Sequence, residues 1–166
     1  MIDVASLRQA ATQRAAARQA LPFDGVITSD IVHGLPVRLY TPHGVVMDVT
    51  IYFSHGGYGL FGDLNLQDAY CRALAATSGR RVIAVDYRLA PENTFHESVN
   101  DLVRCVNACS GPGCAVLCGD SAGGALSVAA AAQVPVRALL LTNPNLDLTL
   151  ESFDRHVKRP EFVGDS

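Results

Sequence analysis

Residues Cys114–Val128 read CAVLCGDSAGGALSV. A short apolar run leads into Gly-Asp-Ser-Ala-Gly-Gly, and more small residues follow. The pattern predicts a strand that turns sharply into a helix, with Ser121 at the turn and small neighbours where the two elements approach closely. The Ser121 hydroxyl would then project above the sheet at a helix N-terminus, which favours developing negative charge. The alternative is an ordinary turn in which Ser121 caps the helix.

Strand and helix patterns alternate on both sides of this stretch. We expect strands at 49–54, 81–86, 114–118 and 136–141, and helices at 64–78, 95–109 and 121–132. Strand followed by helix, repeated, implies a mostly parallel α/β sheet with helices on both faces. In such sheets ligands bind beyond the carboxyl ends of the strands. Loops rich in Gly or Pro follow three of these strands, at 55–62, 87–94 and 119–124.

The N-terminal part adds a helix and a hairpin to this plan. Residues 1–20 are Ala-rich and predict an N-terminal helix. Strand patterns at 26–32 and 36–40 meet at His33-Gly34, which is a hairpin signal. We therefore expect a single domain over residues 1–166 whose sheet begins with an antiparallel hairpin.

Composition narrows the function classes. The chain has 49% apolar and 17% charged residues and a net charge of -3, which is typical of a globular protein. The basic cluster at 155–159 is too small for a nucleic-acid surface, so no nucleic-acid partner is expected. No apolar run reaches the roughly 18 residues of a membrane span, and the N-terminus lacks the order of a signal peptide. These features predict a cytoplasmic protein.

The five cysteines are an odd number, which argues against a disulfide framework. Four of them form a C-x3-C-x4-C-x3-C pattern that raises a zinc hypothesis: Cys105, Cys109, Cys114 and Cys118. The pattern lacks a C-x2-C knuckle and is divided between an expected helix and an expected strand. We therefore expect buried, apolar cysteines in a reducing compartment, and no metal site.

His55-Gly56-Gly57 directly follows an expected strand. Glycines let backbone N–H groups come close to a reacting carbonyl oxygen. In this type of fold an oxyanion hole takes donors from such a loop and from the residue after the nucleophile. Gly56 and Gly57 are therefore expected to act with Ala122. His55 is expected to hydrogen-bond the loop, because a residue that shapes the loop is poorly placed to serve Ser121 as a base.

Three motifs occur in order at the ends of successive strands: HGG at 55–57, DYRLAPE at 86–92 and GDSAGG at 119–124. Together they resemble the hormone-sensitive-lipase-like esterases of the α/β-hydrolase fold, over about residues 37–148. The resemblance implies hydrolysis of carboxylic esters, usually with short or medium acyl chains, without metal or cofactor. A small-molecule ester is the expected partner.

By this resemblance Ser121 is the catalytic nucleophile, and the N–H groups of Gly56, Gly57 and Ala122 form the oxyanion hole. The DYRLAPE segment would support that hole. The expected supporting residues are His55, Asp86 and Asp120.

The sequence departs from the family in two places. Tyr58 stands where the family usually has a third glycine, which would shift the loop or narrow the acyl site. The fold's triad order is Ser, then Asp or Glu, then His, and the family's acid and histidine motifs have no counterpart after Leu148. We therefore expect a chain without the last strands, with 150–166 a tail or the start of a missing cap segment, and an impaired site.

Local residues offer weak substitutes for the missing acid and base. Asp147 matches a family position that is not catalytic, and Asp154 and His156 lie two residues apart in the tail. His96 follows the DYRLAPE loop, but the surface of a helix is the expected place for it. A triad needs the base within roughly 3 Å of the nucleophile, so none of these is expected to complete one.

Two other interpretations remain open. Residues 57–62 fit G-x-G-x-x-G and Asp86 ends the next strand, as in a dinucleotide-binding unit, although the glycines should then open the helix directly. The chain could also be an inactive pseudo-hydrolase that binds a small ester or a protein. In either hydrolase interpretation the strand at 136–141 is left as an exposed apolar edge, which predicts self-association.

Overall fold

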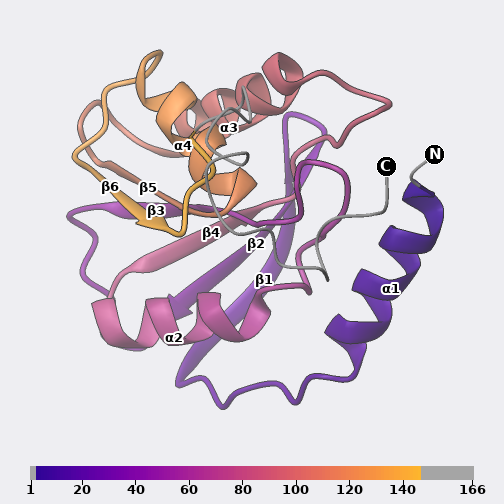
Figure 1. The fold of residues 1–166 in the computed structure, drawn as a ribbon. Coiled ribbons are helices and arrows are strands. Elements are labelled where there is room, and N and C mark those ends of the chain that lie inside the picture. Colours follow the sequence, from indigo (N-terminus) through magenta and orange to yellow (C-terminus); the bar gives the residue numbers. More distant parts are fainter. Residues whose placement is uncertain (1–2, 147–166) are drawn as a thin grey trace.

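The computed structural model describes residues 3–146, which form one six-stranded sheet flanked by helices (Figure 1). The strands are β1 (Gly25–Val32), β2 (Leu35–Pro42), β3 (Thr50–Ser54), β4 (Arg81–Val85), β5 (Ala115–Asp120) and β6 (Ala138–Thr142). The helices are α1 (Val4–Ala16), α2 (Asp68–Ser78), α3 (Phe95–Cys109) and α4 (Ala122–Ala131).

The strand order is β1-β2-β4-β3-β5-β6. β1 pairs with β2, and β2 with β4, in antiparallel fashion. The remaining pairs, β4 with β3, β3 with β5 and β5 with β6, are parallel. Along the chain from β3 to β6, one helix lies between each two consecutive strands, as β-α-β units require. The predicted mostly parallel sheet with an N-terminal antiparallel hairpin is confirmed.

Helices cover both faces of the sheet, with α2 on one side and α3 and α4 on the other (Figure 1). Successive residues of a strand point to opposite faces. On β3, Tyr52 therefore packs into the core beneath α3 and α4, whereas Phe53 packs into the core beneath α2. Both side chains are buried, and burial of one large apolar side chain contributes about 1.5–3 kcal/mol.

Helix boundaries follow local capping. α3 has the predicted bounds, and it begins at Phe95 because Thr94 and Glu97 form a capping box, in which each side chain accepts the other residue's backbone N–H. α2 begins at Asp68, later than the predicted position 64. The reason is Asp63, whose carboxylate accepts the N–H groups of Asn65 at 2.7 Å and Leu66 at 3.0 Å and so closes a separate turn.

The cysteines only partly match the prediction. Cys71, Cys105 and Cys118 are buried, but Cys109 and Cys114 are exposed, because one ends α3 and the other follows a surface turn. Cys105 belongs to the core on one face of the sheet and Cys118 to the core on the other. The four-cysteine pattern therefore does not converge on one point.

α1 is attached by few contacts. Ala11 is its single buried residue, and its Arg8 side chain hydrogen-bonds the Leu60 and Ala90 carbonyls. Over residues 3–146, none of the helices combines the length and the apolar character that crossing a membrane requires.

β6 is an edge of the sheet as far as the chain is described, and it pairs with β5 alone. Leu139 and Leu140 on it are 37% and 42% exposed. An exposed apolar edge strand can pair with a second copy, so we predict self-association of the purified chain, measured by light scattering. Leu140→Lys should lower the association, whereas Val128→Lys, an equally exposed site on α4, should not. A wild-type chain that stays monomeric at high concentration would contradict the prediction.

Candidate active site

Ser121 lies between β5 and α4 with φ 52° and ψ -116°. A residue other than glycine in the left-handed region costs roughly 1–2 kcal/mol, so the turn must be held by its surroundings. The Ser121 N–H donates to the Thr142 carbonyl at 3.0 Å, and the Ser121 carbonyl accepts from Gly124 at 3.0 Å and Asn145 at 3.1 Å. The backbone thus makes the sharp strand-to-helix turn that a G-x-S-x-G serine occupies.

Two glycines allow this turn to pack. A Cβ atom on Gly119 would lie 2.1 Å from the Gly123 carbonyl oxygen. A Cβ atom on Gly123 would lie 2.0 Å from the carbonyl oxygen of Ser54, at the end of β3. Both obstacles are backbone atoms, which cannot move aside as a side chain can. The first turn of α4 can therefore rest on the end of β3 only when these positions are glycine.

We predict that Gly123→Ala lowers the free energy of unfolding by about 3 kcal/mol or more, at the upper end of overpacking costs. The matched control is Gly111→Ala, where a Cβ atom meets no atom within 4 Å and φ is not positive. That substitution should be neutral or stabilising by up to about 1 kcal/mol. Urea denaturation of both variants measures the difference, and equal stabilities would show that the close approach is not needed.

The HGG loop lies directly against the serine turn. A Cβ atom on Gly56 would be 2.7 Å from Asp120 Oδ2 and 3.4 Å from Ser121 Cβ. Gly57 has φ 127°, and its carbonyl accepts from the N–H groups of Leu60 at 2.9 Å and Phe61 at 3.1 Å, which closes the loop. The fold therefore brings together the loop and the turn that are separated in the sequence.

Gln67, which the sequence analysis missed, joins the two motifs. Its Oε1 accepts the Gly56 N–H at 2.9 Å, and its Nε2 donates to Asp120 Oδ2 at 2.9 Å. The Gly56 N–H, which the sequence predicted as an oxyanion donor, is thus occupied by Gln67 in this structure. No sequence signal marked Gln67, since a glutamine before a helix is commonplace and its partners are remote in the chain.

Other backbone N–H groups at the site are free to donate. Ala122 is the first residue of α4, so its N–H has no acceptor within the helix. Within residues 3–146, the N–H groups of Gly57 and Tyr58 also have no hydrogen-bond acceptor. Tyr58 has φ 56° and a 62% exposed side chain. The tyrosine thus adopts a left-handed conformation that glycine would take without strain, with its ring toward solvent.

His55 holds the glycine loop through a hydrogen bond to Gly56 and contacts with Tyr87. Its Nδ1 donates to the Gly56 carbonyl at 2.8 Å, and burial lowers the pKa of its ring, so the ring is neutral. The Tyr87 hydroxyl donates to the His55 carbonyl at 2.7 Å, and the two rings stack with their centroids 4.4 Å apart. Gly62 leaves room for the ring, because a Cβ atom there would lie 2.4 Å from Nδ1. Two DYRLAPE residues therefore contact the glycine loop: Tyr87 through His55, and Ala90, whose N–H donates to the Gly59 carbonyl at 2.8 Å.

Arg8 of α1, which the sequence analysis also missed, hydrogen-bonds residues of two loops. Its Nε donates to the Leu60 carbonyl at 2.9 Å, and its Nη2 to the Ala90 carbonyl at 2.9 Å. The same guanidinium pairs with Glu92 at 2.7 Å and holds the pKa of that carboxyl down at about 2. One side chain of the N-terminal helix therefore links the glycine loop to the DYRLAPE segment.

Asp86 directly follows β4 and is partly buried; this burial raises the pKa of its carboxyl to about 6, with Asp63 adding to the rise. Within the described residues its carboxylate accepts no hydrogen bond that would offset this. Its ionisation therefore opposes folding.

A raised pKa means that the ionised form is disfavoured in the folded state, so wild-type stability is lost as the pH rises from about 4 through about 6. We predict that Asp86→Asn removes this loss, so that the stability difference in favour of the variant grows between pH 4 and pH 7. Urea denaturation across this range measures it. A difference that is independent of pH would contradict the buried, unpaired state of Asp86.

Within residues 3–146 no histidine hydrogen-bonds to Ser121 Oγ. His33 lies in the turn between β1 and β2, His43 pairs with Asp24 at 2.8 Å, and His96 is exposed in the first turn of α3. The remaining candidates, Asp147, Asp154 and His156, lie outside the described residues. The described part of the chain therefore gives Ser121 no general base.

The glycines at 57–62 close a loop, and α2 begins only at Asp68. In a dinucleotide-binding unit the glycines open the helix so that its N-terminus meets the pyrophosphate. The geometry therefore disfavours the dinucleotide interpretation and leaves the serine turn as the centre of the site.

Residues 51–164 match a family with the alpha/beta hydrolase fold, and the chain belongs to this family. The chain is 36% identical over 145 residues to the carboxylesterase NlhH of Mycobacterium tuberculosis, covering 76% of this chain and 45% of that protein. It is 37% identical over 102 residues to the carboxylic ester hydrolase LipN of the same organism, covering 56% of this chain and 27% of that protein.

Solved structures agree. A bacterial esterase of the hormone-sensitive lipase family has a TM-score of 0.80 and 25% identity, over 97% of this chain and 60% of that one. A hormone-sensitive lipase from a metagenome library has a TM-score of 0.81 and 25% identity, and the match covers 91% of this chain and 54% of that one. The predicted likeness to the hormone-sensitive-lipase-like esterases is confirmed. The chain spans less than half the length of the two curated relatives and just over half of these structures.

Proposed function

We propose that this chain carries the nucleophile and the oxyanion hole of a carboxylic ester hydrolase, with Ser121 at the nucleophile elbow. The observation that supports this most is the apposition of a strained serine turn and a glycine loop with unoccupied N–H groups. In the proposal Gly57 and Ala122 donate to the oxyanion, and Tyr58 takes the place that the sequence had assigned to Gly56.

The reaction would proceed through an acyl-enzyme. Ser121 Oγ attacks the ester carbonyl carbon, and the carbonyl oxygen becomes an oxyanion that the loop and helix N–H groups stabilise. The bond from that carbon to the alcohol oxygen then breaks, the alcohol leaves, and the Oγ proton is transferred to the leaving alcohol through solvent. Water afterwards attacks the acyl carbon and releases the acid and the free serine. Each donor of such a hole is worth about 10²–10³ in rate.

We propose that turnover by this chain alone is slow. Both steps of acyl transfer normally use a histidine, first to accept the serine proton and then to activate water. The described residues supply no histidine at Ser121. Loss of a triad's base lowers the rate by about 10⁶-fold, and the oxyanion hole and substrate binding retain the rest.

The relatives' printed names support an ester of a carboxylic acid as the substrate class. The five free cysteines, two of them exposed, support a reducing compartment such as the cytoplasm.

The test is steady-state hydrolysis of p-nitrophenyl butyrate by the full chain, Ser121→Ala and the control Ser29→Ala, whose serine is exposed on β1. We expect slow release of p-nitrophenol that Ser121→Ala reduces to background and Ser29→Ala leaves unchanged. Neither His96→Ala nor His156→Ala should change the rate.

Fast turnover that His156→Ala abolishes would overturn the slow-turnover part and leave the role of Ser121 intact. A wild-type rate equal to that of Ser121→Ala, together with saturable binding of an ester analogue, would favour the alternative of a pseudo-hydrolase that binds without reaction.

A further inference from the structure

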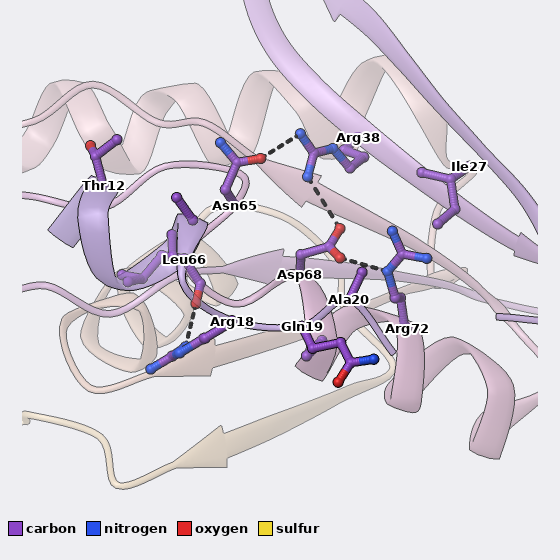
Figure 2. Close-up of a pocket in the computed structure, with 13 residues that line it drawn as sticks. Thr12, Arg18, Gln19, Ala20, Ile27, Arg38, Asn65, Leu66, Asp68 and Arg72 are labelled. Atoms are coloured by element: carbon purple, nitrogen blue, oxygen red, sulfur yellow. Dashed lines mark hydrogen bonds and ion pairs between the residues drawn. The ribbon is translucent and has the colours of Figure 1, made fainter. Parts of the chain in front are cut away.

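One cavity among the described residues lies away from Ser121. Its volume is about 530 Å³, within the range of small-molecule sites. In Figure 2 the Gln19 amide, from the segment after α1, extends to the side on which Arg72 of α2 lies, whereas the Arg18 guanidinium points the other way and bonds the Leu66 carbonyl. Arg38 of β2 lies beyond Asp68 in this view. The cavity thus lies between the end of the N-terminal helix and the face of the sheet that α2 covers.

The lining of this cavity is positively charged in an acidic protein. Three arginines, Arg18, Arg38 and Arg72, face one aspartate, Asp68, which leaves two uncompensated positive charges while the chain as a whole carries -3. Asp68 is fully engaged, since Arg38 reaches its Oδ1 at 3.1 Å and Arg72 its Oδ2 at 2.5 Å. The excess charge is therefore available to a ligand.

Specific donors in the cavity are unoccupied. Arg72 uses Nε for Asp68 and Nη1 for the Leu21 carbonyl at 3.3 Å, so its Nη2 has no acceptor within residues 3–146. Arg18 uses Nη1 for the Leu66 carbonyl, so its Nε and Nη2 are unoccupied in the same range. The Gln19 amide makes no hydrogen bond to any described residue either, and these donors line one cavity from two elements.

We propose that this cavity binds a small organic anion, with a carboxylate or phosphate head held by Gln19 and Arg72 and with Arg18 adding positive charge farther along the lining. Arginine's planar donors match both head groups. The rest of the lining is largely aliphatic, with Ile27 and Leu66 among alanines, and suits a short hydrocarbon part. The proposal is independent of ester hydrolysis, because Ser121 does not line the cavity.

Binding of the anion would also stabilise the packing of α1 against the rest of the protein. α1 has a single buried residue, so donors from the segment after it and from α2 that share one anion would add a link where few contacts exist. Because Arg8 of the same helix bonds the glycine loop, occupancy of the cavity would stabilise the loop beside Ser121 as well.

The test is calorimetric titration of the full chain in low-salt Tris with butyl phosphate and, separately, with butyrate. We expect saturable one-to-one binding of at least one probe, with a Kd below about 10 mM. Gln19→Glu places a negative charge among the arginines and should abolish binding, whereas Gln19→Lys should tighten it several-fold. Gln19 makes no hydrogen bond within the described residues, so neither change removes a contact there.

Arg18→Gln removes one of the three arginine charges that line the cavity and should weaken binding several-fold. Arg137→Gln removes the same charge from an exposed site just before β6, at the opposite edge of the sheet, and should leave binding unchanged. Ser121→Ala should also bind normally, which separates this proposal from the proposed function. Failure of both probes to saturate, or equal affinities in Gln19→Glu and Gln19→Lys, would overturn the proposal.

Discussion

The contact between the first turn of α4 and the end of β3 is the constraint on which the site depends. Gly123 passes so close to the Ser54 carbonyl that no side chain fits, and Gly119 passes equally close to Gly123. This approach forces Ser121 into the left-handed region, where bonds to Thr142 and Asn145 hold it. Because β3 also carries the HGG loop at its end, the same contact sets the distance between the serine and that loop.

A polar network then fixes the loop against the turn. Gln67 connects Gly56 to Asp120, and Tyr87 bonds the carbonyl of His55. Arg8 reaches across from the N-terminal helix to Leu60. These bonds occupy some donors and leave others free, so the network selects which N–H groups could meet an oxyanion. Preorganised donors of this kind are worth more than flexible ones, since they need no rearrangement during the reaction.

Local sequence patterns predicted much of the fold and the turn at Ser121. Thr94 and Glu97 form the capping box at the start of α3, and the glycine spacing predicted the turn at Ser121. What could not be read from the sequence depends on contacts between distant residues. Gln67 and Arg8 hydrogen-bond residues far from them in the sequence. Gln67 is also the residue that occupies the Gly56 N–H. The exposure of Cys109 and Cys114 likewise depends on which helix end and turn face solvent.

Mass spectrometry of the chain after incubation with p-nitrophenyl butyrate tests most directly whether Ser121 acts as a nucleophile. Because residues 3–146 place no base at Ser121 to activate water, deacylation should be slower than acylation by an activated ester, so the acyl-enzyme should accumulate. We predict one persistent butyryl group on the peptide that contains Ser121, absent from Ser121→Ala. No adduct on that peptide, or the same adduct pattern in Ser121→Ala, would contradict the claim that this strained turn presents a nucleophile.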